Sequence, residues 1–198
     1  ILNNIKTNQP NIKESNPTTN SSGNQVNIKT KNAVPNELIQ KHVEENIMYA
    51  RMTGIKEVMP CEVHKGVAYL VGGAPSYKNN ENMKMYRKAV KEPGHYLFSS
   101  KTALNHLLSN NIIPYGCILL DPREHIPSYV DEVNTKVIYF VASQCNPEAV
   151  RKLHEKGAKV VLYHAAVNAG EADVVKKLGT KSPLIGGGST SVTRGIGM

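Results

Sequence analysis

The stretch Ala68-Tyr-Leu-Val-Gly-Gly-Ala-Pro-Ser-Tyr77 joins a short apolar run to a glycine turn. The run from Val67 to Val71 is almost wholly apolar, which is typical of a strand buried on both faces. Two glycines and Pro75 then turn the chain, and a helical pattern follows. Free N–H groups at the start of a helix, together with the helix dipole, favour a negatively charged group. The pattern therefore suits an anion-binding turn, and equally well a plain tight turn.

Strands and helices continue to alternate along the chain. Strands are predicted at 67–72, 95–99, 116–122, 137–142 and 159–164, and helices at 80–91, 101–109 and 147–156. Short apolar strands separated by helices of about ten residues are typical of right-handed βαβ units. We predict an α/β protein with a doubly wound, mainly parallel sheet and helices on both faces.

Composition divides the chain into three segments. Residues 1–35 contain nine Asn and little apolar content, which predicts an extended or disordered arm. Residues 36–60 form a helix and a connection, with Asn36 as the expected N-cap and Gly54 as the residue that ends the helix. Apolar residues at helical spacing form its buried face: Ile39, Val43, Ile47 and Ala50. The sheet domain is expected over 61–198, truncated at its C-terminus if the sequence is a fragment.

The formal net charge is +8, from 24 Lys and Arg against 16 Asp and Glu. This balance suits a phosphate-bearing ligand or nucleic acid, but the lysines are scattered, so we do not expect a nucleic-acid function. The three cysteines lie far apart, which argues against a disulfide framework or a zinc site. No apolar run reaches the ~18–20 residues of a membrane span, and no signal peptide opens the chain, so we expect a cytoplasmic protein.

Residues that follow the predicted strands are candidates for a site, because ligands of such sheets bind beyond the carboxyl ends of the strands. These candidates are Gly72–Ser76, Ser99-Ser100, Asp121–Arg123, Ser143–Asn146 and His164. Asp121 suits a ribose or metal contact, or only a turn before Pro122. His164 suits a general base, or a packed histidine. Cys145 suits a nucleophile, although no partner base is evident.

The loop Gly186-Gly-Gly-Ser-Thr-Ser191 is a second anion-binding candidate. It combines a free backbone with three hydroxyls just before a helical pattern, whereas the structural alternative is a glycine linker. Two anion-binding turns at one sheet edge would suit a ligand with two phosphates, or with one phosphate and a second charged group.

Three motifs in this order and spacing carry a family resemblance: Val71-Gly-Gly-Ala-Pro-Ser76, Ile118-Leu-Leu-Asp-Pro122 and Gly186-Gly-Gly-Ser-Thr-Ser-Val192. The chain resembles, over about residues 65–198, the domain named after the archaeal 6-hydroxymethylpterin diphosphokinase, which also occurs in flagellin-modifying Maf proteins. The segment Val141–Pro147 looks most like phage- or prophage-encoded members. The Gly-x-Pro-Ser turn is also similar to that of bacterial sialyltransferases, which bind a CMP-sugar.

The resemblance implies a Rossmann-like fold that binds a nucleotide or nucleotide-sugar, and transfer chemistry on that donor, with Mg²⁺ expected for a diphosphokinase. It assigns ligand binding to Gly72, Gly73, Ala74, Pro75, Ser76, Asp121, Gly187, Gly188, Ser189, Thr190 and Ser191. Catalytic residues stay unknown, with His164 and Asp121 as weak candidates, because the family continues past the position of Met198. The alternatives are a non-catalytic nucleotide-binding or structural phage module and a nucleic-acid-associated protein. A homo-oligomer formed through the arm and the first helix is a further expectation.

Overall fold

The computed structural model describes residues 18–19, 25–26, 34–60, 65–166 and 169–186. The chain divides into two compact units, residues 1–32 and 33–198. In the first unit, β1 (Thr18–Thr19) pairs antiparallel with β2 (Gln25–Val26). Of the rest of the predicted arm, only Val34 and Pro35, just before α1, belong to the described residues.

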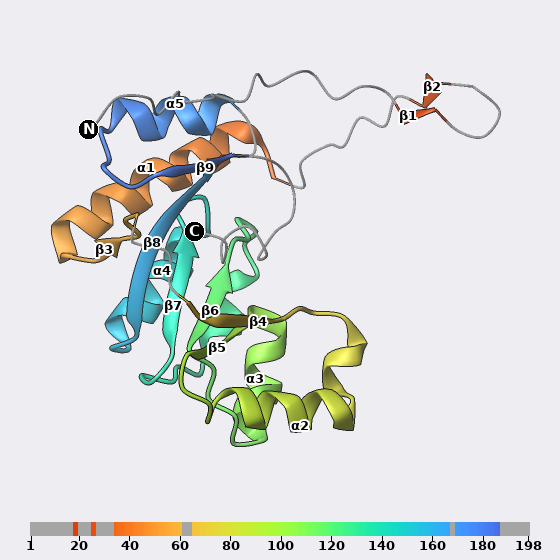
Figure 1. Ribbon diagram of the computed structural model, residues 1–198. Helices are drawn as coiled ribbons and strands as arrows, with labels where there is room; N and C mark the ends of the chain where they lie inside the picture. The colour runs from red at the N-terminus through yellow and green to blue at the C-terminus, as the bar shows by residue number, and fades with distance from the viewer. Residues whose placement is uncertain (1–17, 20–24, 27–33, 61–64, 167–168, 187–198) are drawn as a thin grey trace, which may run out of the picture. The chain divides into compact units, whose positions relative to one another are not determined.

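The second unit contains all the predicted elements, with ends shifted by a few residues (Figure 1). Its helices are α1 (Asn36–Thr53), α2 (Asn80–Ala89), α3 (Lys101–Ser109), α4 (Pro147–Glu155) and α5 (Ala169–Lys177). Its strands are β3 (Lys56–Glu57), β4 (Val67–Val71), β5 (His95–Ser100), β6 (Gly116–Leu119), β7 (Ile138–Ala142), β8 (Lys159–Ala166) and β9 (Leu184–Gly186). Two short 3₁₀ helices, η1 (Pro75–Lys78) and η2 (Ile126–Val130), follow β4 and β6. Helix α5 was not predicted.

The strands form one parallel sheet in the order β3-β8-β7-β6-β5-β4, which confirms the predicted α/β class with a mainly parallel sheet. Strand β9 also pairs with β8. Because β7 occupies one edge of β8, β3 and β9 share the other edge. They pair with different stretches of it, Glu57 beside Leu162 and Leu184 beside His164. Helix α1 and β3 thus belong to the same compact unit as the sheet.

All five described helices cover one face of the sheet, whereas helices were expected on both. The strand register places four residues of neighbouring strands on this face: Ser99, Cys117, Tyr139 and Val160. Three apolar clusters fill it, one with α2 and α3, one with α3 and α4, and one with α1 and α5. The reason is strand order. From β4 to β9 each new strand is added on the same side of the last, so right-handed crossovers keep every helix on one face.

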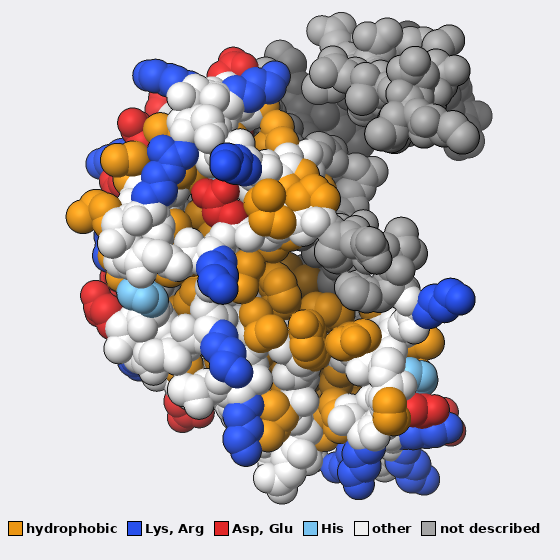
Figure 2. Space-filling model, turned by 60° about the vertical axis from the view of Figure 1, so that its left-hand side comes forward, with side chains coloured by type: hydrophobic (Ala, Val, Ile, Leu, Met, Phe, Trp, Pro, Cys, Tyr) orange, Lys and Arg blue, Asp and Glu red, His pale blue; other side chains and the backbone are white. Residues whose placement is uncertain are grey.

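The opposite face carries a cluster built from strands and their connections alone, with Phe98, Ile118, Phe140 and Tyr163 among its members. The Phe98 ring lies 5.5 Å from Tyr115 and 6.0 Å from Phe140, measured between ring centroids. Gly116 makes room for these rings, because a Cβ atom there would lie 2.7 Å from Phe140. Hydrophobic side chains gather in a hollow of the molecule, as Figure 2 shows.

Helix α1 packs beside α5 and against α4 (Figure 1). It begins at Asn36, so Pro35 occupies the N-cap position that was predicted for Asn36. Gly54 ends it with a φ of 76°, as predicted, because glycine adopts this left-handed conformation without strain. Met48 and Met52, on its outer side, are exposed. No helix in the described part of the chain is long and apolar enough to cross a membrane.

Candidate functional site

The predicted glycine turn follows β4 and lies on the surface. Residues 72–76 are exposed, whereas Tyr77 is buried and anchors η1, its amide donating to the carbonyl of Ala74 at 3.1 Å. Neither Gly72 nor Gly73 has a positive φ. A Cβ atom on Gly72 would meet nothing within 4 Å, and one on Gly73 would make an ordinary contact with Thr102 at 3.8 Å. The fold itself therefore does not require glycine at these two positions.

The turn lies beside the first turn of α3, because Gly73 faces Thr102. Ser100, one of the candidate residues after the second predicted strand, occupies the N-cap position of α3. Its side chain makes no capping hydrogen bond, and its Oγ is buried without a partner. The first N–H groups of α3 consequently have no side-chain acceptor, and a helix start in this state favours an anion.

Asp121, just past β6, is held by two cations. Lys101 Nζ donates to Oδ2 at 2.8 Å, and Arg123 Nε donates to Oδ1 at 2.9 Å. Burial works to raise the pKa of the Asp121 carboxyl, but the hydrogen bonds from Arg123 and Lys101 outweigh it and hold this pKa well below its usual range. The Lys101 ammonium also lies 4.8 Å from the centre of the Tyr129 ring. Asp121 is therefore ionised and occupied, which suits positioning of the two cations better than accepting a proton.

The loop after β7 is tied to Asp121 and to α1. Asn46 of α1, itself buried, donates from Nδ2 to the carbonyls of Ser143 and Cys145 at 2.8 and 2.7 Å. The Cys145 thiol donates to the Asp121 carbonyl at 3.3 Å. Asn146 caps α4 by accepting from the Glu148 amide at 3.0 Å. The loop after β7 thus contacts α1, the segment after β6 and the start of α4.

Cys145 is a poor nucleophile in this setting. Its side chain is completely buried, and burial raises its pKa to about 12. A thiol with such a pKa carries almost no thiolate at neutral pH, and the thiolate is the reactive form.

His164 lies inside the fold. Its side chain is completely buried, and its Nε2 lies 3.7 Å from Oε2 of Glu57 on β3. Burial lowers the pKa of His164 more than the nearby Glu57 carboxylate raises it, so the ring is neutral at neutral pH. A general base must reach its substrate, and the structure gives His164 no exposed atom for that.

The structure brings Gly73, Asp121 and the loop after β7 into one region through α3 and its Lys101. Lys101 was not singled out in the sequence, although its place directly after a predicted strand was a usable signal. No signal in the sequence pointed to Asn46, since its role depends on how α1 packs. The residues predicted at 187–191 lie outside the described part of the chain. Among the described residues, no group of three or more His, Cys, Asp or Glu could hold a metal ion.

The sequence matches a known protein family. A family model described as 6-hydroxymethylpterin diphosphokinase MptE-like matches residues 41–197, from within α1 to the glycine-rich loop. No curated protein matches the chain.

Proposed function

The chain belongs to the 6-hydroxymethylpterin diphosphokinase MptE-like family, and from this membership we propose that it is a transferase domain that binds a nucleotide or nucleotide-sugar donor. The donor phosphates lie at the glycine turn 72–76, beside the start of α3, within reach of Lys101 and Arg123. The loop at 187–191 holds the donor from a second side.

One observation carries this proposal: a surface turn with two glycines that the fold does not need lies beside an uncapped helix start. A backbone without side chains lets a ligand approach its N–H groups closely, which is how phosphates are held in glycine-rich turns. The nearby ion cluster supports it. Lys101 and Arg123 pair with the single carboxylate of Asp121 there, so one positive charge of the cluster is not neutralised. Half of the Arg123 side chain is exposed, so this charge is accessible to a ligand.

Mg²⁺, which the family implies, does not fit a site preformed by the described residues. Both oxygens of Asp121 already accept hydrogen bonds from Lys101 and Arg123. Mg²⁺ is usually held by one or two carboxylates together with the substrate phosphates. Donor binding is therefore measured both with and without the metal.

A non-catalytic nucleotide-binding module is the second candidate, and a specific observation favours it. Three described residues that the sequence offered as catalytic candidates are not available as a base or a nucleophile. Asp121 is held in ion pairs, Cys145 is buried with a raised pKa, and His164 is completely buried. Activity with a bound donor separates the two candidates.

The test is the thermal stability of the full chain with ATP, GTP, CMP or a CMP-sugar, each with Mg²⁺ and with EDTA. A ligand that binds the folded state raises the Tm. We expect a rise with at least one nucleotide that persists in EDTA. A CMP-sugar response without an ATP response would favour glycosyl transfer over diphosphoryl transfer. If no nucleotide raises the Tm, the proposal is wrong.

Gly72→Ala tests the site itself. The new Cβ atom meets open space and the backbone has no positive φ, so the free energy of unfolding should change by less than about 0.5 kcal/mol. Nucleotide affinity should fall on the order of tenfold, which is ~1.4 kcal/mol. Ser76→Ala and Ser189→Ala should also weaken binding, with Ser109→Ala at the far end of α3 as the control. If all four variants bind the nucleotide with equal affinity, the binding site does not lie in these loops.

A further inference from the structure

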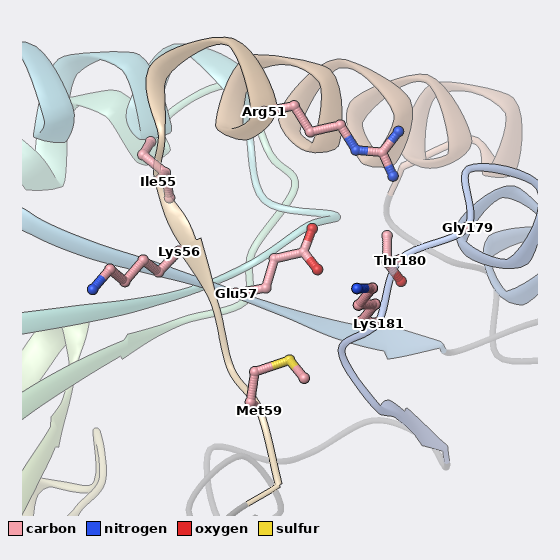
Figure 3. Close-up of a pocket in the computed structure, with 8 residues that line it drawn as sticks. All are labelled: Arg51, Ile55, Lys56, Glu57, Met59, Gly179, Thr180 and Lys181. Carbon is pink, nitrogen blue, oxygen red and sulfur yellow. The ribbon is translucent and has the colours of Figure 1, made fainter.

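A pocket of about 510 Å³ opens at the edge of the sheet that β3 and β9 share. Figure 3 shows it between the end of α1, β3 and the segment that joins α5 to β9. Eight residues line it: Arg51, Ile55, Lys56, Glu57, Met59, Gly179, Thr180 and Lys181. In strand order, this edge is the opposite one from β4 and its glycine turn.

The pocket exists because two strands share one edge of β8 without meeting. Strand β3 ends beside Leu162, where the amide of Val58 donates to the Leu162 carbonyl at 2.8 Å, and β9 begins beside His164. Gly179, with a φ of 63°, turns the chain into this gap after α5. Arg51 closes the upper side, since its Nη2 donates to the carbonyl of Leu178.

Opposite charges face each other across the pocket without touching. In Figure 3 the Glu57 carboxylate points toward Thr180 and Lys181, and the Arg51 guanidinium lies across from it, whereas Lys56 points away. Yet the ion pairs among the described residues do not include Glu57 with Arg51 or with Lys181. The charges on the two sides of the pocket are therefore not paired directly with one another in this structure.

A buried histidine lies next to Glu57. His164 is completely buried, and its Nε2 lies 3.7 Å from Oε2 of Glu57. Neither ring nitrogen has a partner at hydrogen-bond distance. Buried polar groups without partners are rare in native proteins, and they mark places where a proton or a ligand is missing. A buried ring without hydrogen-bond partners therefore lies next to the Glu57 carboxylate that faces the pocket.

We propose that this pocket binds a small zwitterion, a molecule with one ammonium group and one carboxylate or phosphate group on a short linker. The ammonium lies against Glu57. The anionic group lies between Arg51 and Lys181, with the Thr180 hydroxyl as a further donor. A simple anion would meet the Glu57 carboxylate, and a simple cation would meet Arg51 and Lys181, so only a ligand with both charges satisfies all the groups.

The test is titration calorimetry on the full chain with four probes. Phosphoethanolamine and β-alanine carry both charges, whereas inorganic phosphate and ethylamine carry one each. We expect at least one zwitterion to bind ten times more tightly than either single-charge probe. The two zwitterions distinguish a phosphate from a carboxylate as the anionic group.

Variants then locate the binding. Lys181→Gln changes an exposed side chain and should weaken zwitterion binding at least fivefold, whereas Lys136→Gln, which is equally exposed and on another part of the surface, should not. Glu57→Gln should remove the preference for a zwitterion over phosphate. Should Glu57→Gln fail to fold, Lys181→Gln alone decides.

Phosphate binding as tightly as phosphoethanolamine, no heat with any probe, or an unchanged Kd in Lys181→Gln would each overturn the proposal. None of these outcomes bears on binding at the glycine turn 72–76, because this pocket and β4 lie at opposite edges of the sheet.

Discussion

Asp121 shows how one residue can stand at a predicted site and yet have an unexpected state. Its position after a strand was readable in the sequence, and so was the nearby Arg123. The hydrogen bond from Lys101 to Asp121 could not be predicted, because it depends on where α3 starts relative to β6. A carboxylate that accepts hydrogen bonds from two cations suits positioning of Lys101 and Arg123, whereas the sequence suggested a ribose or metal contact, a turn or a weak catalytic candidate.

The first prediction concerns Asp121→Asn. Because the folded pKa of Asp121 lies below its unfolded value of ~3.9, this carboxylate adds stability above that pH and loses its contribution as the pH falls below about 4. The variant should lose about 1–3 kcal/mol of unfolding free energy at pH 7, since hydrogen bonds to a charged group are lost. Urea unfolding of both proteins at pH 7 and pH 2 measures this, because most of the contribution is lost only well below the unfolded pKa. A gap that is as large at pH 2 as at pH 7 would contradict it.

The second prediction concerns the thiols. Cys117 and Cys145 are both buried, and burial raises the pKa of each to about 12. Near pH 8 only about one in ten thousand of such groups is a thiolate. The folded protein should therefore expose at least two fewer thiols to Ellman's reagent than the protein in guanidinium chloride. Rapid reaction of all three cysteines in the folded protein would show that these side chains are accessible.

At the scale of elements, α1 is more than a covering helix. Its buried Asn46 fixes the loop after β7 by two hydrogen bonds, and this loop in turn binds the backbone of Asp121. A residue at the middle of the first helix therefore helps to shape an edge that the later strands build.

Asn46→Leu tests this link. Two buried carbonyls would lose their donor, which should cost roughly 2–4 kcal/mol of unfolding free energy. Hydrogen exchange should also become faster at residues 143–146. Met52→Ala on the exposed side of α1 is the control and should change little. If exchange in the loop is unchanged in Asn46→Leu, α1 only covers the sheet.

Elements with strong apolar patterns were predictable, and weak ones were not. The five strands from β4 to β8 have continuous apolar runs, so both their positions and their parallel class followed from the sequence. Helix α5 was missed because Ala169-Gly-Glu-Ala opens it with little apolar periodicity. Strand β3 has only two residues, and its partner lies far along the chain. The position of all described helices on one face of the sheet depends on strand order, and strand order cannot be predicted from local sequence patterns.

At the scale of the whole molecule, the sheet is unequal in stability. Strand β6 is buried along its full length at the centre, whereas β3 is a two-residue edge strand. Native-state hydrogen exchange should show β6 and β7 amides opening only with global unfolding. The Val58 amide, bonded to Leu162, should open at a free energy lower by about 2 kcal/mol or more. Equal protection of both sets would mean that the edge and the centre open together.

The pairing of β3 with β8 also has a consequence during synthesis on the ribosome. Strands β5 to β8 each join the strand made just before them, so this part of the sheet can grow as the nascent chain emerges. Strand β3 is made before all of them but has no partner strand until β8 has been translated. Until then the apolar side of α1, with Val43, Ile47 and Ala50, stays uncovered. The helix and strand made first in this unit thus complete their packing only after the strand made near its end, so an apolar helix face stays exposed to other chains in the meantime.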